Sequence, residues 1–143
     1  MSLRDATRSM IDECLPDSSV IHQRCRYVVE ENSRLQRACD DLKNCDMISF
    51  GKKMIETHDG LSTLYEVSCP ELDCLVNAVR NERGVYGARM MGGGFGGCTI
   101  NLIKSDHVER VTQRVSRVYQ QTTGKTLTIY PVKPGDGTST DHR

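Results

Sequence analysis

The apolar positions from Ser18 to about Asn44 recur at alternating steps of four and three residues, which places them on one face of an α-helix. This stripe consists of Ile21, Cys25, Val28, Asn32, Leu35, Cys39 and Leu42. It predicts a long amphipathic helix that buries this face and begins after a start signal at residues 16–18. We expect the amide of Asn32 to bond to a neighbouring backbone group rather than a ligand, because most buried polar side chains are satisfied within the protein.

Three further helices are predicted from the apolar spacing. The first runs from Asp46 to about His58, where Gly60 breaks the pattern. The second follows a capping box at residues 68–71 (SCPE), stops at Gly84, and buries Leu72, Leu75, Val76 and Val79. The third is capped by Asp106 and Glu109, ends at Gly124, and carries Val108, Val111, Val115 and Val118 on one face.

The segments between these helices have strand character. Residues 85–91 and 98–103 form two short runs joined by a glycine-rich loop, and residues 127–132 form a third run near the end of the chain. The order of elements predicts the α+β class, with a small, mostly antiparallel sheet covered on one face by helices.

Five of the six residues from Gly92 to Gly97 are glycine, and they match the pattern GxGxxG. A dinucleotide-binding loop would open a helix, whereas this loop opens a strand. A P-loop would end in Gly-Lys-Ser/Thr, and the protein-kinase motifs VAIK, HRD and DFG are absent from the sequence. Two interpretations stay equally open: amides that face an anion, or a close crossing of another chain segment. The nearby Arg89 could pair with a phosphate or with a neighbouring carboxylate.

Composition narrows the class of protein. A chain of 143 residues suits one domain, and 19 basic against 19 acidic residues argue against general nucleic-acid binding. No apolar run reaches the length of a membrane span and the first residues lack a secretory signal, so we expect a cytoplasmic protein without membrane contact. The seven cysteines lie singly, which predicts reduced thiols and no metal site, with Cys25 and Cys39 as apolar filler.

The residues in and around the loop identify a family more specifically than the GxGxxG pattern does. Residues 87–90 (GARM) and 92–99 (GGGFGGCT) closely resemble the third signature motif of galactokinases, which belong to the GHMP small-molecule kinases. Residues 3–6 (LRDA), 24–34 (RCRYVVEENSR), 65–73 (YEVSCPELD) and 130–137 (YPVKPGDG) resemble other galactokinase stretches in the same order. The resemblance covers about residues 3–137, so we expect this family's C-terminal domain at 1–137 and a flexible tail at 138–143.

The resemblance implies a function for the longer protein. Galactokinases transfer the γ-phosphoryl group of Mg·ATP to the C1 hydroxyl of α-D-galactose, chemistry that rests on positioning and electrostatic stabilisation. The resemblance implies that the cofactors ATP and Mg²⁺ and the sugar are held mostly by the N-terminal part, which this sequence does not contain. It offers no catalytic residue here and implies cofactor contacts at Gly92, Gly93, Gly94, Phe95, Gly96 and Gly97. We therefore expect the isolated chain to be inactive, and to self-associate through an uncovered apolar surface.

Departures from the family pattern leave alternatives open. Met91 stands where the family commonly has Thr, Tyr27 replaces the usual His, and residues 60–63 (GLST) replace a frequent Ser-Leu/Met-Arg-Asp. His58 is retained, and we expect a structural hydrogen-bonding residue rather than a catalyst, since no partner lies at a defined offset. The alternatives are a non-catalytic galactokinase-like sensor or interaction module, and a kinase for a related sugar such as N-acetylgalactosamine.

Overall fold

The computed structural model describes residues 2–135 and residue 137 of the chain. Over these residues it contains five α-helices, one short 3-10 helix and a two-stranded sheet, which confirms the α+β class. In chain order the elements are α1 (Arg8–Cys14), α2 (Val20–Lys43), α3 (Met47–Thr63), α4 (Pro70–Val79), β1 (Val85–Met91), β2 (Cys98–Ile103), η1 (Ser105–His107) and α5 (Val108–Thr123). Helix α1 was not predicted, and the tail at 138–143 lies outside the described residues.

The two strands form an antiparallel hairpin with the predicted bounds. Met91 pairs with Cys98 at the loop end and Val85 pairs with Ile103 at the other end, with an irregularity between Val85 and Gly87. The third predicted strand, at residues 127–132, is wrong, because these residues form no strand. Leu127 and Ile129 instead pack against the core cluster, so this segment buries its apolar side chains without joining a ladder.

The main core lies between the hairpin and helices α4 and α5. Its buried members are Leu75, Val76, Val79, Ala88, Val111, Val115 and Tyr119. The apolar faces predicted for the second and third shorter helices are therefore largely confirmed. Gly124 adopts φ 70° and ends α5 as predicted, because only glycine takes this left-handed conformation at little cost.

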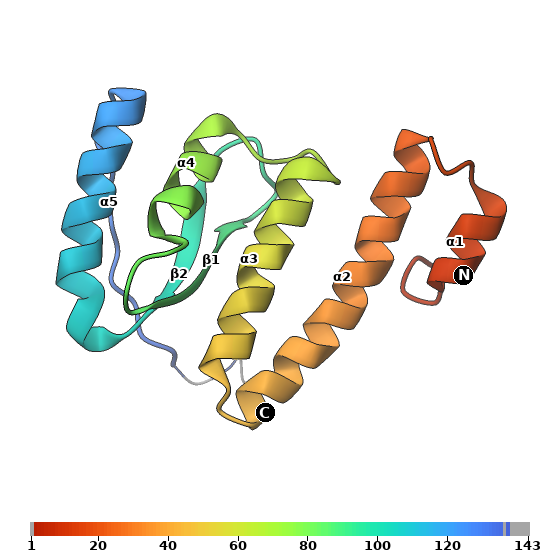
Figure 1. Cartoon of the computed structure of the whole chain (residues 1–143), viewed down its shortest axis with the longest axis horizontal. Coiled ribbons are helices and arrows are strands. Elements are labelled where there is room, and N and C mark those ends of the chain that lie inside the picture. Colours follow the sequence, from red (N-terminus) through yellow and green to blue (C-terminus); the bar gives the residue numbers. More distant parts are fainter. Residues whose placement is uncertain (1, 136, 138–143) are drawn as a thin grey trace, which may run out of the picture.

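Helix α3 covers the edge of β1 that faces away from β2. The backbones of Gly51 and Gly87 meet so closely that a Cβ atom on Gly51 would lie 2.0 Å from the carbonyl oxygen of Tyr86. An uncovered edge strand exposes unpaired backbone groups, and this helix shields them. Figure 1 shows α3 between the hairpin and α2, with α1 on the far side of α2. The prediction that α3 ends at Gly60 is wrong, because the helix continues to Thr63. Gly60 lies against the ring of Tyr27, where a Cβ atom would not fit.

Helix α2 has nearly the predicted length, but only part of the face predicted to be buried is covered: Cys25, Val28 and Asn32 are half-buried. Ile21 is 64% exposed, Leu35 63% and Leu42 46%, and Cys39 is exposed as well. The fully buried side chains of the helix are Tyr27, which faces α3, and His22, which faces α1, and neither belongs to the predicted stripe. The Asn32 amide donates to the backbone oxygen of Leu3 at 3.5 Å, which agrees with the predicted backbone partner.

Most predicted helix caps are displaced. Helix α2 is capped by Ser19, whose hydroxyl accepts from the backbone N–H of His22 at 3.0 Å. The capping box at residues 68–71 does not form, since Cys69 stands at the cap position and the Ser68 hydroxyl donates to Asp73 instead. Neither Asp106 nor Glu109 caps α5, because η1 leads directly into it. Helix α4 ends at Val79, before the predicted stop at Gly84.

The seven cysteines of the chain are free thiols, with Cys25 and Cys69 among the half-buried ones. Of the described helices, none combines the length and apolar character that crossing a lipid bilayer requires. A cytoplasmic location stays a prediction.

Candidate functional site

The glycine loop connects the paired ends of β1 and β2 and lies on the surface. Gly92, Gly94, Gly96 and Gly97 all have positive φ angles, and so does Phe95 at 59°. Residues with a Cβ atom rarely adopt such angles, so the path of this loop explains most of its glycines. The loop is not buried beneath helices: Gly92, Gly93 and Gly97 are exposed, and Gly94 and Gly96 are half-buried.

Part of the loop crosses another chain segment at close range. The backbone N–H of Phe95 donates to the carbonyl oxygen of Val67 at 2.7 Å, and a Cβ on Gly94 would lie 2.1 Å from that same oxygen. The close-crossing interpretation therefore holds at Gly94. A Cβ on Gly92, Gly93 or Gly96 would meet no heavy atom within 4 Å, so these positions border open space.

A pocket of about 280 Å³ lies between the loop residues 95–97 and helices α4 and α5. It is lined by Cys69, Glu71, Leu72, Leu75, Phe95, Gly96, Gly97, Tyr119 and Lys125. The Lys125 ammonium donates to Glu71 at 2.7 Å, and this bond raises the pKa of Lys125 and lowers that of Glu71. The pair neutralises the two charges nearest the pocket, while Phe95 projects its ring outward with 76% of its surface exposed.

A buried polar network lies behind the loop. His58 is 2% exposed, and its Nδ1 atom accepts from the backbone N–H of Met90 at 3.2 Å. Its Nε2 atom lies 3.2 Å from an Asp73 carboxylate oxygen. An Nδ1 acceptor places the single ring proton on Nε2, and burial lowers the pKa of His58 despite the opposing carboxylates of Asp73 and Asp59. The structural role expected for His58 agrees with these partners.

Comparison with known proteins places this architecture in a family. The family model "GHMP kinases C terminal" matches residues 38–121, which include α3, α4, the hairpin and the glycine loop. The chain belongs to the GHMP kinases. It corresponds to their C-terminal domain, as the family resemblance of its sequence indicated.

Proteins named galactokinase are among its relatives. The chain is 42% identical to galactokinase of Bos taurus over 125 residues, covering 87% of this chain and 31% of the bovine protein. It is 35% identical to galactokinase of Thermotoga petrophila over 136 residues, covering 95% of this chain and 38% of the relative. A crystal structure of Lactococcus lactis galactokinase complexed with galactose superposes with a TM-score of 0.82 at 32% identity, covering 88% of this chain and 33% of that one. The chain thus spans less than two fifths of the length of these relatives.

Arg89 of this GHMP kinase domain lies on β1, three residues before the loop begins at Gly92. Its guanidinium donates to the backbone oxygen of Met90 at 3.2 Å. Within the described part of the chain it forms no ion pair with a carboxylate, so the predicted carboxylate pairing is not observed. The alternative, a phosphate partner, stays a prediction.

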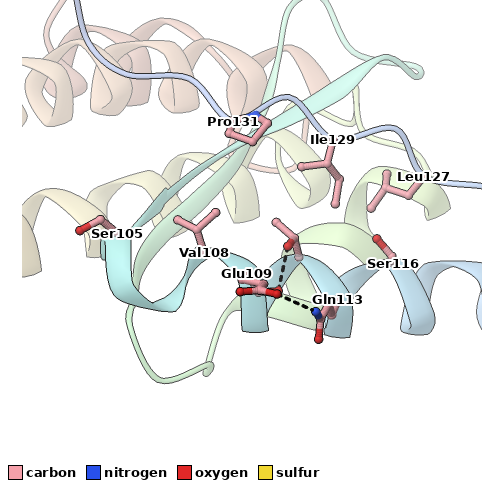
Figure 2. A pocket seen from close by; sticks show the side chains of 9 residues that line it. Ser105, Val108, Glu109, Gln113, Ser116, Leu127, Ile129 and Pro131 are labelled. Carbon is pink, nitrogen blue, oxygen red and sulfur yellow. Dashed lines mark hydrogen bonds between the residues drawn. The ribbon is translucent and has the colours of Figure 1, made fainter.

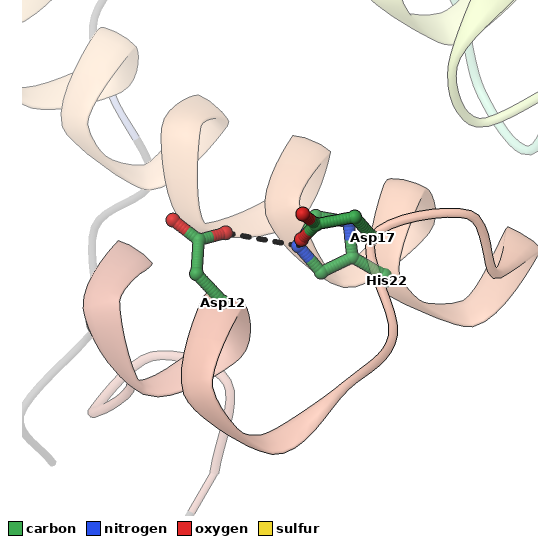
Figure 3. Close-up of side chains that lie close together, drawn as sticks. All are labelled: Asp12, Asp17 and His22. Carbon is green, nitrogen blue, oxygen red and sulfur yellow. Dashed lines mark hydrogen bonds and ion pairs between the residues drawn. The ribbon is translucent and has the colours of Figure 1, made fainter.

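Two other features of the GHMP kinase domain lie away from the loop. Asp12, Asp17 and His22 approach one another between α1 and α2, with His22 Nε2 2.9 Å from Asp12 and 3.6 Å from Asp17 (Figure 3). Arg8 lies 3.7 Å from the other oxygen of Asp12, so a cation already pairs with one carboxylate of this group, and the Asp12–His22 contact ties α1 to α2.

An open groove of about 730 Å³ separates α5 from the extended segment after it. Figure 2 shows Leu127, Ile129 and Pro131 on one side of it, and Val108, Glu109, Gln113 and Ser116 on the other. Glu109 and Gln113 bond to each other along α5 at 3.3 Å. None of the residues that line this groove belongs to the glycine loop.

Sequence reasoning missed the residues that support the loop. Val67, Ser68 and Asp73 lie in the stretch 65–73, which resembles a galactokinase motif but otherwise indicated only a helix cap. The structure brings Val67 to Phe95 of the loop and Asp73 to His58, which are distant in sequence, and Ser68 bonds to Asp73 five residues further on. The motif match pointed to this stretch as a whole, but no spacing rule could assign its partners.

Proposed function

We propose that this chain is the C-terminal part of a galactokinase, an enzyme that transfers the γ-phosphoryl group of Mg·ATP to the C1 hydroxyl of α-D-galactose. Relatives named galactokinase at 35% and 42% identity support the proposal, and so does the overall similarity to a galactokinase complexed with galactose. The observation that carries it is the exposed glycine loop, in which a Cβ atom on Gly92, Gly93 or Gly96 would point into open space.

The loop suits the phosphates of ATP as a main-chain contact surface. Backbone N–H groups without neighbouring side chains can approach an anion closely, and a ring of such donors favours negative charge. ATP supplies the transferred group when it is bound, and the chain's own part is to shape one wall of the cleft and to exclude water. The loop carries no carboxylate, so we assign the Mg²⁺ ligands to the remainder of the longer protein.

A chimaera tests this assignment. The matching 125 residues of the bovine galactokinase would be replaced by this chain, and galactose-dependent ADP release measured. We expect the chimaera to phosphorylate galactose. Gly93→Val should lower kcat/KM by about tenfold or more, because a side chain would enter the space a phosphate needs. Gly135→Val, which also adds atoms to open space, is the matched control. A folded chimaera without activity, or one in which both variants behave alike, would contradict the proposal.

The isolated chain should not catalyse phosphoryl transfer. A glycine loop can neither accept the proton of a sugar hydroxyl nor hold a metal ion, so half a cleft performs no phosphoryl transfer. Purified chain mixed with galactose and Mg·ATP should release ADP no faster than buffer does. Sustained ADP release that depends on galactose would show that this chain contains a complete active site.

We also propose that the isolated chain self-associates through the exposed stripe of α2. Ile21, Leu35 and Leu42 are exposed apolar side chains on one face of this helix, and exposed apolar surface drives association. Leu35→Ser should shift the chain toward monomer in sedimentation velocity without lowering its melting temperature, because Leu35 contributes little to the core. Wild-type chain that sediments as a monomer at high concentration would refute this.

A further inference from the structure

We propose that His58 and Asp73 are positioning residues of the glycine loop: together they fix the strand end from which the loop departs and the segment that the loop crosses. The inference deepens the proposed function and rests on it only for the loop's contact with phosphate. Both residues act through other groups and neither touches the open face of the loop.

The first arm of this support holds the end of β1. Met90 lies two residues before Gly92, and its N–H points away from β2 to the Nδ1 atom of His58 at 3.2 Å. His58 comes from α3, the helix that covers this strand edge. The Met90 side chain is 1% exposed. The last buried residue before the loop is therefore fixed by packing and by one directed hydrogen bond.

The second arm holds the segment beneath the loop. Asp73 accepts from the Ser68 hydroxyl at 2.6 Å and from the Ser62 hydroxyl at 3.1 Å. Ser68 directly follows Val67, whose carbonyl oxygen accepts from the Phe95 N–H and lies under Gly94. The same Asp73 carboxylate lies 3.2 Å from His58 Nε2. One side chain on α4 thus joins both arms.

This arrangement requires a neutral His58 with its proton on Nε2. A second proton would occupy Nδ1 and would turn a donor toward the N–H donor of Met90. The charged groups facing the ring are Asp73 from α4, Asp59 from α3, and Arg80 just after α4, which pairs with Asp59. Burial is the largest influence and lowers the pKa of His58 below its ordinary value of 6.5. The contribution of His58 is therefore complete above about pH 6.5 and is lost as the pH falls through the lower folded-state pKa.

Nuclear magnetic resonance of the ¹⁵N-labelled chain tests the proposal. Ring nitrogen shifts should show the neutral Nε2–H form of His58 at pH 7. Ser68→Ala should speed hydrogen exchange of the Phe95 amide about tenfold and leave the Met90 amide unchanged. His58→Gln retains a donor that reaches Asp73 but withdraws the Nδ1 acceptor, so it should speed exchange at Met90 and spare Phe95. Asp106→Asn breaks the exposed Asp106–His107 pair and is the control that should alter neither amide.

Several results would overturn the inference. These are an Nδ1–H form of His58, variants that leave both amides at wild-type rates, or an equal rise in exchange at Val111 and Val115 in α5, which would indicate general destabilisation. As the pH falls through the folded-state pKa of His58, which lies below 6.5, the loop amides of the wild type should shift but those of His58→Gln should not, and identical titrations would also overturn the inference. No readout involves nucleotide. A chimaera without activity would therefore refute the proposed function without refuting this inference.

Discussion

Gly51→Ala should test how α3 is seated on β1. In an exposed helix this change stabilises a protein by about 1 kcal/mol, because alanine has the higher helix propensity. Here the added Cβ would lie 2.0 Å from the Tyr86 oxygen, 2.3 Å from its carbon and 2.9 Å from the Gly87 nitrogen. All three are backbone atoms, so no side chain can rotate away. The two backbones would have to separate by about 1.4 Å to move from 2.0 Å to ordinary contact at 3.4 Å.

The expected result is a loss of about 2–3 kcal/mol, the upper part of the range of about 1–3 kcal/mol for overpacked interiors, because only backbone can yield. For a chain of this size such a loss corresponds to a melting temperature about 8–12 °C lower. Circular dichroism of Gly51→Ala and of Lys52→Ala, an exposed neighbour on the same helix, would measure it. If Gly51→Ala melted at or above the wild-type temperature, the conclusion that the backbones of α3 and β1 are in close contact at Gly51 would be refuted.

Two further predictions concern other parts of the fold. Gly124→Ala should lower stability by about 1 kcal/mol, because alanine at φ 70° is strained, and urea unfolding would measure the shift in midpoint. Burial raises the pKa of the Tyr27 phenol well above its ordinary value of 10.0, so stability should hold below about pH 10 and fall as the pH climbs further. Tyr27→Phe should show a smaller fall between about pH 9 and pH 11 in the same assay, and an equal fall would contradict the assignment.

Local sequence patterns correctly predicted the elements that are bounded by glycines or that carry a regular apolar stripe. The strands of the hairpin end at glycines, and α5 carries a regular valine stripe, so both could be placed from the sequence. Periodicity gave the extent of α2 but not its buried face, because the packing of α1 and α3 decides which side is covered. Tyr27 and His22 are buried by those neighbours, and neither belongs to the apolar stripe.

The position of the candidate site in the sequence could be predicted, but the residues that hold the loop in place could not. The glycine cluster and the family resemblance located the loop, and the open space at Gly93 agrees with a main-chain surface. The role of Asp73 could not be predicted, because its bonds to Ser62, Ser68 and His58 depend on how α3 and α4 pack. The segment at 127–132 has strand composition, but it forms no strand, and Leu127 and Ile129 pack against the core instead.

Phe95 shows that this chain is not optimised for its own folding. A residue with a side chain at φ 59° costs roughly 1–2 kcal/mol of conformational strain, and a ring that is 76% exposed returns little of it through burial. Glycine at this position would give a more stable chain. Engineering guided only by thermal stability would therefore discard the ring first, and with it whatever benefit the ring brings once another surface closes over it.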